Sequence, residues 1–145
     1  MLYKQNETLK EFERICREID ALYHEIACSV NLSDSAYCIL RTFLVLGDEL
    51  TQTEIYRFTC LNKQTVNSSI KKLKEDGMIY LHKRKGKEIK ISLTEKGKEV
   101  INSKILPIEL KESEIFDEMP MEDKEALIRI NRYYLSSLRK KMEEL

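Results

Sequence analysis

The stretch that decides the fold is residues 62–97, NKQTVNSSIKKLKEDGMIYLHKRKGKEIKISLTEKG. Its first part predicts a short helix, because Val66, Ile70 and Leu73 recur at spacings of four and three residues. Gly77 stands where a left-handed residue commonly ends a helix. Two runs of alternating apolar residues then flank a basic turn that contains a glycine, and this pattern predicts a β-hairpin. The stretch therefore predicts a helix followed by two antiparallel strands.

The excess positive charge of the chain is concentrated in the same stretch. Residues 62–90 contain nine Lys and Arg against three Asp and Glu, a net charge of +6, although the whole chain of 145 residues has a formal net charge of zero. An acidic block at residues 109–125 lies well apart from it in the sequence. This polarity indicates an anionic partner for the basic block, whereas the acidic block is equally well explained as a solvated helical face.

A second short helix is predicted immediately before the basic helix. Thr51 and Glu54 have the spacing of a capping box, in which a hydroxyl caps the helix and a carboxylate three residues later bonds back to the cap. After a short break, Asn62 is placed to cap the basic helix. Two short helices joined by a tight turn are typical of a helix-turn-helix.

Longer helices are predicted on both sides of this module. Apolar residues recur every three or four positions through residues 1–28, and Ser33 is placed to cap a second helix. Thr94 is placed to cap a fifth helix, which Pro107 is expected to kink, and Pro120 precedes a last amphipathic helix. The predicted fold class is therefore mainly α (α+β), in a single domain that spans the chain.

Composition and motifs argue against several classes of protein. No apolar run approaches the ~18 residues that a membrane-spanning helix needs, and the N-terminus lacks the pattern of a secretion signal. The four cysteines, Cys16, Cys28, Cys38 and Cys60, have no Cys-x-x-Cys spacing, so neither a zinc ribbon nor a disulfide scaffold is indicated. We expect a reducing, cytoplasmic setting. No catalytic motif is present, and we expect no enzyme activity, no cofactor and no bound metal.

The basic helix carries side chains that suit a nucleic-acid groove. The run Thr65–Ser69 consists of β-branched or short polar residues, each of which costs up to roughly 0.7 kcal/mol of helix propensity relative to alanine. Such residues let a helix approach a groove closely, and Gln64 and Asn67 can pair bidentately with adenine. Lys71 and Lys72 lie two turns into the helix, where they are well placed for backbone phosphates. This composition favours DNA recognition over helix stability.

The hairpin tip adds four cations, Lys83, Arg84, Lys85 and Lys87. A narrow minor groove attracts arginine, so Arg84 is the predicted minor-groove residue. His82, beside the tip, can contact a phosphate when it is protonated. Each lysine taken alone can equally be a solvated surface charge, whereas the group together indicates contact with DNA.

These motifs together resemble the MarR family of bacterial transcriptional regulators. The resemblance is carried by Thr51–Ile55, Asn62–Val66, Leu73 with Gly77–Ile79, and Leu93–Gly97. In the order and length of its elements it extends over the whole chain. Two features depart from the family pattern: Ser68 stands where many members have Arg, and the hairpin lacks the Asp-x-Arg that often braces the wing.

The resemblance implies a homodimer. Residues 1–28 and 98–145 would form its helical dimerisation region, and residues 33–97 the winged helix-turn-helix lobe that reads a pseudo-palindromic operator in double-stranded DNA. The predicted DNA-binding residues are Asn62, Lys63, Gln64, Thr65, Asn67, Ser68, Lys71, Lys72, Lys83, Arg84, Lys85 and Lys87. Of these, the residues between Lys63 and Ser68 match positions where the family contacts bases and nearby phosphates.

The predicted function is sequence-specific transcriptional regulation, with repression as the expected sign. A winged-helix protein-interaction module that uses the acidic surface is the alternative. Family members often bind phenolic or acidic small molecules between the dimer helices and the DNA lobe, so an effector of that kind is expected. Some members sense oxidants with a cysteine of the N-terminal helix. Cys16 lies in that region, and its other interpretation is a small apolar core residue.

Overall fold

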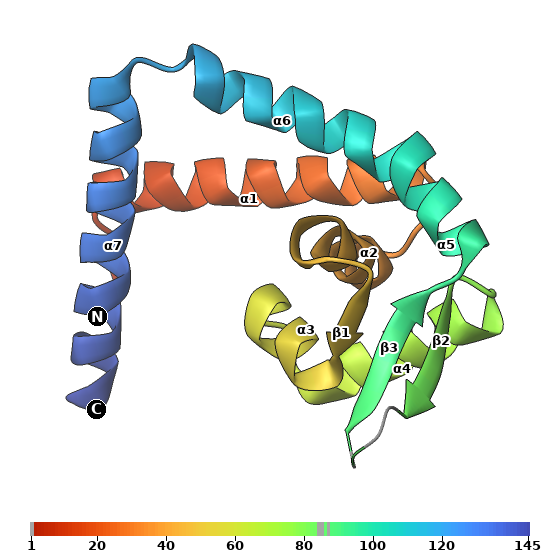
Figure 1. The fold of residues 1–145 in the computed structure, drawn as a ribbon. Helices are drawn as coiled ribbons and strands as arrows, with labels where there is room; N and C mark the ends of the chain where they lie inside the picture. Colours follow the sequence, from red (N-terminus) through yellow and green to blue (C-terminus); the bar gives the residue numbers. More distant parts are fainter. Residues whose placement is uncertain (1, 84–85, 87) are drawn as a thin grey trace. The chain divides into compact units, whose positions relative to one another are not determined.

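The computed structural model describes residues 2–83, 86 and 88–145 (Figure 1). The chain forms two compact units, which meet in sequence between Leu106 and Pro107. The first unit contains α1 (Glu7–Ser29), α2 (Asp34–Leu46), β1 (Glu49–Thr51), α3 (Gln52–Thr59), α4 (Lys63–Glu75), β2 (Ile79–Lys83), β3 (Ile89–Leu93), α5 (Glu95–Val100) and the π-helical segment η1 (Ile101–Ile105). The second consists of α6 (Leu106–Glu118) and α7 (Met121–Glu143). The predicted mainly helical winged helix-turn-helix fold is confirmed.

Helix starts follow the side-chain caps that the sequence predicts. Ser33 caps α2 by accepting the N–H of Ala36 at 3.2 Å, and Thr51 and Glu54 form the predicted capping box at the start of α3. The first helix differs from the prediction. It begins at Glu7 and not at the chain start, because the side chain of Asn6 caps it.

The core of the first unit lies where α2, α3 and α4 meet the sheet, and Figure 1 shows these helices grouped beside the strands. Its fully buried side chains include Ile39 and Phe43 of α2, Ile55 of α3 and Leu73 of α4. Helices α2 and α4 are also joined by a hydrogen bond of 2.5 Å between the hydroxyls of Ser35 and Ser69. Packing of this kind holds α4 at a defined angle, with one face turned outward.

The sheet has three antiparallel strands in the order β1-β3-β2. The predicted hairpin is present, with Ile79 paired to Leu93 and Lys83 paired to Ile89. Strand β1 was not predicted, because three residues are too few to show an alternating pattern. The alternation of the hairpin is only half buried: Leu81 and Ile89 are 39% and 48% exposed. These two residues of the wing therefore stand partly in solvent.

Gly97 is a position that the fold requires to be glycine. A Cβ atom added there would lie 2.1 Å from the carbonyl oxygen of Met78, well inside van der Waals contact. The N–H of Thr94 also bonds to that carbonyl, at 3.0 Å. The start of α5 is thus packed directly against the chain that enters the wing.

The segment before Pro107 shows how the chain accommodates a proline in a helix. Residues Ile101–Ile105 form a π-helical segment between α5 and α6, with Ile101 and Ile105 buried. Proline has no N–H to donate to the carbonyl four residues earlier, which commonly distorts the preceding turn. The sequence predicted a kink here, and the structure has a local change of helix type.

The helices of the second unit have large apolar side chains that are exposed in the single chain. They include Leu110, Ile115, Phe116, Leu127, Ile128, Ile130, Tyr133, Leu135, Leu138 and Met142. Within the described residues, no helix is long and apolar enough to cross a membrane. Apolar side chains at this density on surface helices are a feature of interfaces.

Candidate nucleic-acid interface

Helix α4 divides its residues between core and solvent as the sequence predicts. Val66, Ile70 and Leu73 are buried. The exposed positions of the same helix are Lys63, Gln64, Asn67, Ser68, Lys71, Lys72, Lys74 and Glu75, and Thr65 is half-buried. Six of the predicted DNA-binding residues therefore lie on the solvent side of one helix, together with the half-buried Thr65.

The N-terminus of α4 is held by its own cap. The Oδ1 atom of Asn62 accepts the N–H of Thr65 at 2.8 Å, so the side-chain oxygen of this predicted contact residue is already used. The ammonium group of Lys63 lies 5.9 Å from the centroid of the Tyr56 ring, within cation–π range. Positive charge and helix-terminal N–H groups thus occupy the same end of α4, which is the arrangement that attracts phosphate.

The amide of Asn67 is tied to α3. Its Oδ1 accepts a hydrogen bond of 2.9 Å from the hydroxyl of Tyr56 and a second from Nε2 of Gln52. Gln52 also donates to the Tyr56 hydroxyl at 2.7 Å. Because its oxygen accepts twice, Asn67 presents mainly its Nδ2 donor to a ligand, and the predicted bidentate pairing with adenine does not fit this state. Gln64, exposed one turn earlier, is the better candidate for that pairing.

Gln52 and Tyr56 were missed by the sequence analysis. They are four residues apart on α3 and so share a face, which a helical projection reveals. Their approach to Asn67 depends on the angle between α3 and α4, which the sequence does not provide. The structure adds both to the candidate interface as residues that orient an α4 side chain.

The two lysines of the last turns of α4 differ in their surroundings. Lys72 forms an ion pair at 3.1 Å with Asp76, the C-cap residue of α4. Lys71 is exposed beside it. A partly neutralised lysine attracts a phosphate less than an unneutralised one, so Lys71 is the stronger candidate for a phosphate contact.

The wing is described in part. Lys83 is exposed at the end of β2, while Arg84, Lys85 and Lys87 lie outside the described residues. The ring Nε2 of His82 is 2.8 Å from the hydroxyl of Ser92 and 3.7 Å from a carboxylate oxygen of Glu49. In this position His82 bridges all three strands and braces the wing, and its contact with a phosphate stays a prediction.

The capping box at the start of α3 shifts the pKa of one of its side chains. The pKa of Glu54 is lowered from its ordinary value of 4.5, first by the hydrogen bond from the Thr51 backbone N–H and then by the Thr51 hydroxyl. The N–H bond measures 2.6 Å. Folding therefore favours the charged carboxylate at the start of the helix-turn-helix.

A cavity lies between α1 and α2, apart from the exposed face of α4. This cavity of about 480 Å³ is lined by Asp20, Tyr23, His24, Ala27, Asp34, Tyr37, Cys38 and Arg41. Across the part of the chain that the structure describes, no group of three or more His, Cys, Asp or Glu is arranged to hold a metal ion. The lining combines aromatic rings with both signs of charge, which suits a small polar aromatic molecule.

The fold and the exposed face of α4 define a winged helix-turn-helix protein. Residues 30–87 match the model of the MarR family. The predicted resemblance to the MarR family is thereby confirmed. No curated protein matches the sequence significantly.

Solved structures of MarR family regulators share the fold of the whole chain. A MarR family regulator from Neisseria meningitidis is 20% identical with a TM-score of 0.80, over 97% of this chain and 99% of that one. MepR of S. aureus in complex with DNA is 19% identical with a TM-score of 0.70, over 94% and 99%. The regulator PcaV of Streptomyces coelicolor, in complex with its natural ligand, is 12% identical with a TM-score of 0.68, over 95% and 99%.

Proposed function

We propose that the protein is a sequence-specific regulator of transcription that binds double-stranded DNA as a homodimer. The observation that carries this proposal is the two-sided structure of α4. Its apolar residues are buried, while Gln64, Ser68 and Lys71 are exposed. The helix begins with Lys63, which adds a positive charge at the N-terminus. A helix of these dimensions fits the major groove, where amides, hydroxyls and cations meet base edges and phosphates.

The homodimer is supported by apolar side chains that the single chain leaves in solvent. On α1, Ile15, Ile19 and Leu22 are between 45% and 57% exposed. Further exposed apolar residues follow along α6 and α7. A second copy would bury these faces and would place two α4 helices on one duplex, with half-sites ~34–36 Å apart. Sedimentation velocity at micromolar concentration tests this, and a strictly monomeric protein would contradict the proposal.

Operator binding is tested directly with DNA that flanks the coding region. An inverted repeat found there, labelled with a fluorophore, should bind more tightly than a scrambled duplex of equal length. The double variant Lys63→Glu and Lys71→Glu should lose operator binding and keep its oligomeric state. If that variant binds the operator as the wild type does, the alternative of a protein-interaction module through the acidic surface is favoured.

We propose also that a phenolic or acidic effector occupies the cavity between α1 and α2. Tyr23 and Tyr37 supply aromatic walls and Arg41 supplies a cation that a carboxylate can meet. Isothermal titration with 4-hydroxybenzoate and benzoate tests this class of ligand. Heat of binding that persists unchanged in Arg41→Gln would place the ligand elsewhere.

A further inference from the structure

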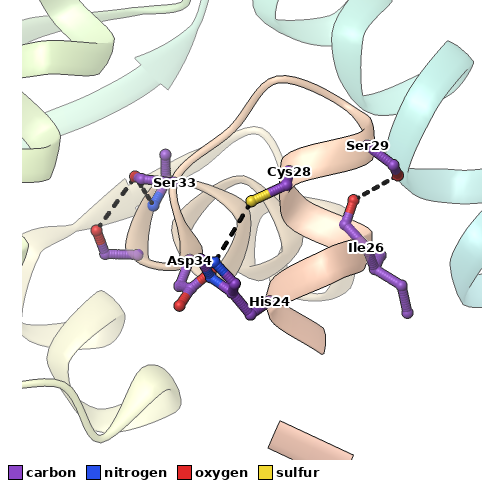
Figure 2. A network of polar contacts seen from close by, with 8 residues as sticks. His24, Ile26, Cys28, Ser29, Ser33 and Asp34 are labelled. Atoms are coloured by element: carbon purple, nitrogen blue, oxygen red, sulfur yellow. Dashed lines mark hydrogen bonds and ion pairs between the residues drawn. The ribbon is translucent and has the colours of Figure 1, made fainter. Parts of the chain in front are cut away.

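Three side chains at the junction of α1 and α2 form a relay that the proposed DNA-binding function does not use. His24 and Cys28 are four residues apart on α1, and Asp34 is the first residue of α2 (Figure 2). The Nδ1 atom of His24 is 2.8 Å from Oδ1 of Asp34, and its Nε2 atom is 3.6 Å from Sγ of Cys28. A thiol, an imidazole and a carboxylate thus stand in series.

The direction of the relay follows from which groups can donate. An ionised carboxylate only accepts hydrogen bonds, so the contact with Asp34 requires a proton on Nδ1 of His24. In the neutral imidazole Nε2 is then the unprotonated nitrogen, and it faces the thiol. This is the order of nucleophile, base and orienting carboxylate that activates cysteine and serine nucleophiles.

The geometry is held by the turn that joins the two helices. The backbone carbonyl of Cys28 accepts the N–H of Asn31 at 3.0 Å, and the N–H of Leu32 bonds to Ala27 at 3.0 Å. Asn31 adopts a left-handed conformation with φ of 60°. A hydrogen-bonded turn of this kind brings Asp34 back alongside His24.

Cys60 and Cys38 have different environments. Cys60, which is also exposed, has its Sγ atom 3.8 Å from the carbonyl of Arg57, an acceptor that cannot take up a proton at neutral pH. Burial raises the pKa of the Cys38 thiol, which keeps that thiol protonated. Cys28 combines exposure with an adjacent base, which is the condition for a reactive thiol.

We propose that Cys28, His24 and Asp34 form a covalent modification site for α,β-unsaturated carbonyl compounds. The thiol proton passes to Nε2 of His24 as sulfur bonds to the β-carbon of the electrophile. The electrons of the carbon–carbon double bond move to the carbonyl and give an enolate, and the imidazolium returns the proton to the α-carbon. The addition needs no oxidant and no leaving group. His24 and Asp34 also line the cavity between α1 and α2, where the electrophile can bind before it reacts.

The test is the rate of adduct formation at each cysteine, measured by peptide mass spectrometry. N-ethylmaleimide, at neutral pH and in slight excess, should label Cys28 about tenfold faster than Cys60. This is less than the roughly 10²–10⁴-fold that a positioned base contributes in enzymes, because the site is exposed. His24→Asn should bring Cys28 down to the rate of Cys60, and Asp34→Asn should give an intermediate rate. Glu25→Gln is the matched control, since it changes an exposed carboxylate next to His24 in sequence.

A second probe tests the class of electrophile. 2-Cyclohexen-1-one, a small conjugated ketone, should add to Cys28 with the same dependence on His24. Equal rates at Cys28 and Cys60, or a His24→Asn variant that labels like the wild type, would overturn the proposal. Absence of a cyclohexenone adduct would overturn the assigned class. Since the readout is adduct mass, the result is independent of whether the protein binds DNA.

Discussion

The hydroxyl of Tyr56 donates a hydrogen bond of 2.9 Å to Oδ1 of Asn67 and so joins α3 to the exposed face of α4. With Gln52 as a second donor, the amide of Asn67 is fixed before any DNA is met. A donor aimed in advance costs less entropy when it meets a base acceptor than a freely rotating one. In this helix-turn-helix, side chains of α3 therefore orient the Asn67 amide that α4 would present to DNA.

Removal of the Tyr56 hydroxyl should weaken discrimination between operators more than it weakens the fold. Tyr56→Phe removes the bond to Asn67 and also the bond that the hydroxyl accepts from Gln52. The bond to Asn67 is worth about 1 kcal/mol, so the ratio of operator to scrambled-duplex affinity should fall by about fivefold. Fluorescence anisotropy with both duplexes measures the ratio. Tyr3→Phe, an exposed tyrosine that precedes α1, is the matched control and should leave it unchanged. An unaltered ratio in Tyr56→Phe would show that the orientation of Asn67 does not matter.

Removal of a charge on α4 should make DNA binding less dependent on salt. The size of the change reports how many phosphates that charge neutralises. Lys71→Gln should reduce the slope of log affinity against log salt by about 0.9, the contribution of one neutralised phosphate. Lys72→Gln should have a smaller effect, because Asp76 already neutralises part of that charge. Lys140→Gln, which removes an exposed lysine of α7, serves as the control. Equal slopes for all three variants and the wild type would remove Lys71 from the interface.

The capping box should make the stability of the first unit depend on acid pH. The folded-state pKa of Glu54 lies below its ordinary 4.5, so the contribution of the carboxylate is complete above that value and is lost as the pH falls through the lowered pKa. Glu54→Gln should therefore melt below the wild type at pH 7, and the two melting temperatures should converge as the pH falls through the lowered pKa of Glu54. Thermal unfolding followed by circular dichroism measures both curves. Glu99→Gln, an exposed carboxylate of α5, should show no such convergence.

Much of the fold was predictable because it is determined by local patterns. The periodicity of Val66, Ile70 and Leu73 and the side-chain caps at Ser33 and Thr51 depend on neighbours within a few residues. Features that need the three-dimensional arrangement were missed. The partners of Asn67 come from another helix, and Cys28 meets Asp34 only because a turn reverses the chain between them.

The requirement for glycine at position 97 should appear as a large and local loss of stability. In Gly97→Ala the new Cβ would meet the carbonyl oxygen of Met78 at 2.1 Å, which is backbone and cannot rotate away. The start of α5 must then move off the wing, at a cost of about 1–3 kcal/mol for overpacking. Urea unfolding should show a lower midpoint for this variant than for the wild type.

The matched control for Gly97→Ala is Asn102→Ala, an exposed position in the adjoining η1 segment. It also introduces an alanine but creates no clash, so its free energy of unfolding should stay within about 0.5 kcal/mol of that of the wild type. DNA binding by Gly97→Ala should weaken in parallel, because the wing that carries Lys83 is packed against α5 at this contact. A Gly97→Ala protein as stable as Asn102→Ala would mean that α5 and the wing can separate without cost.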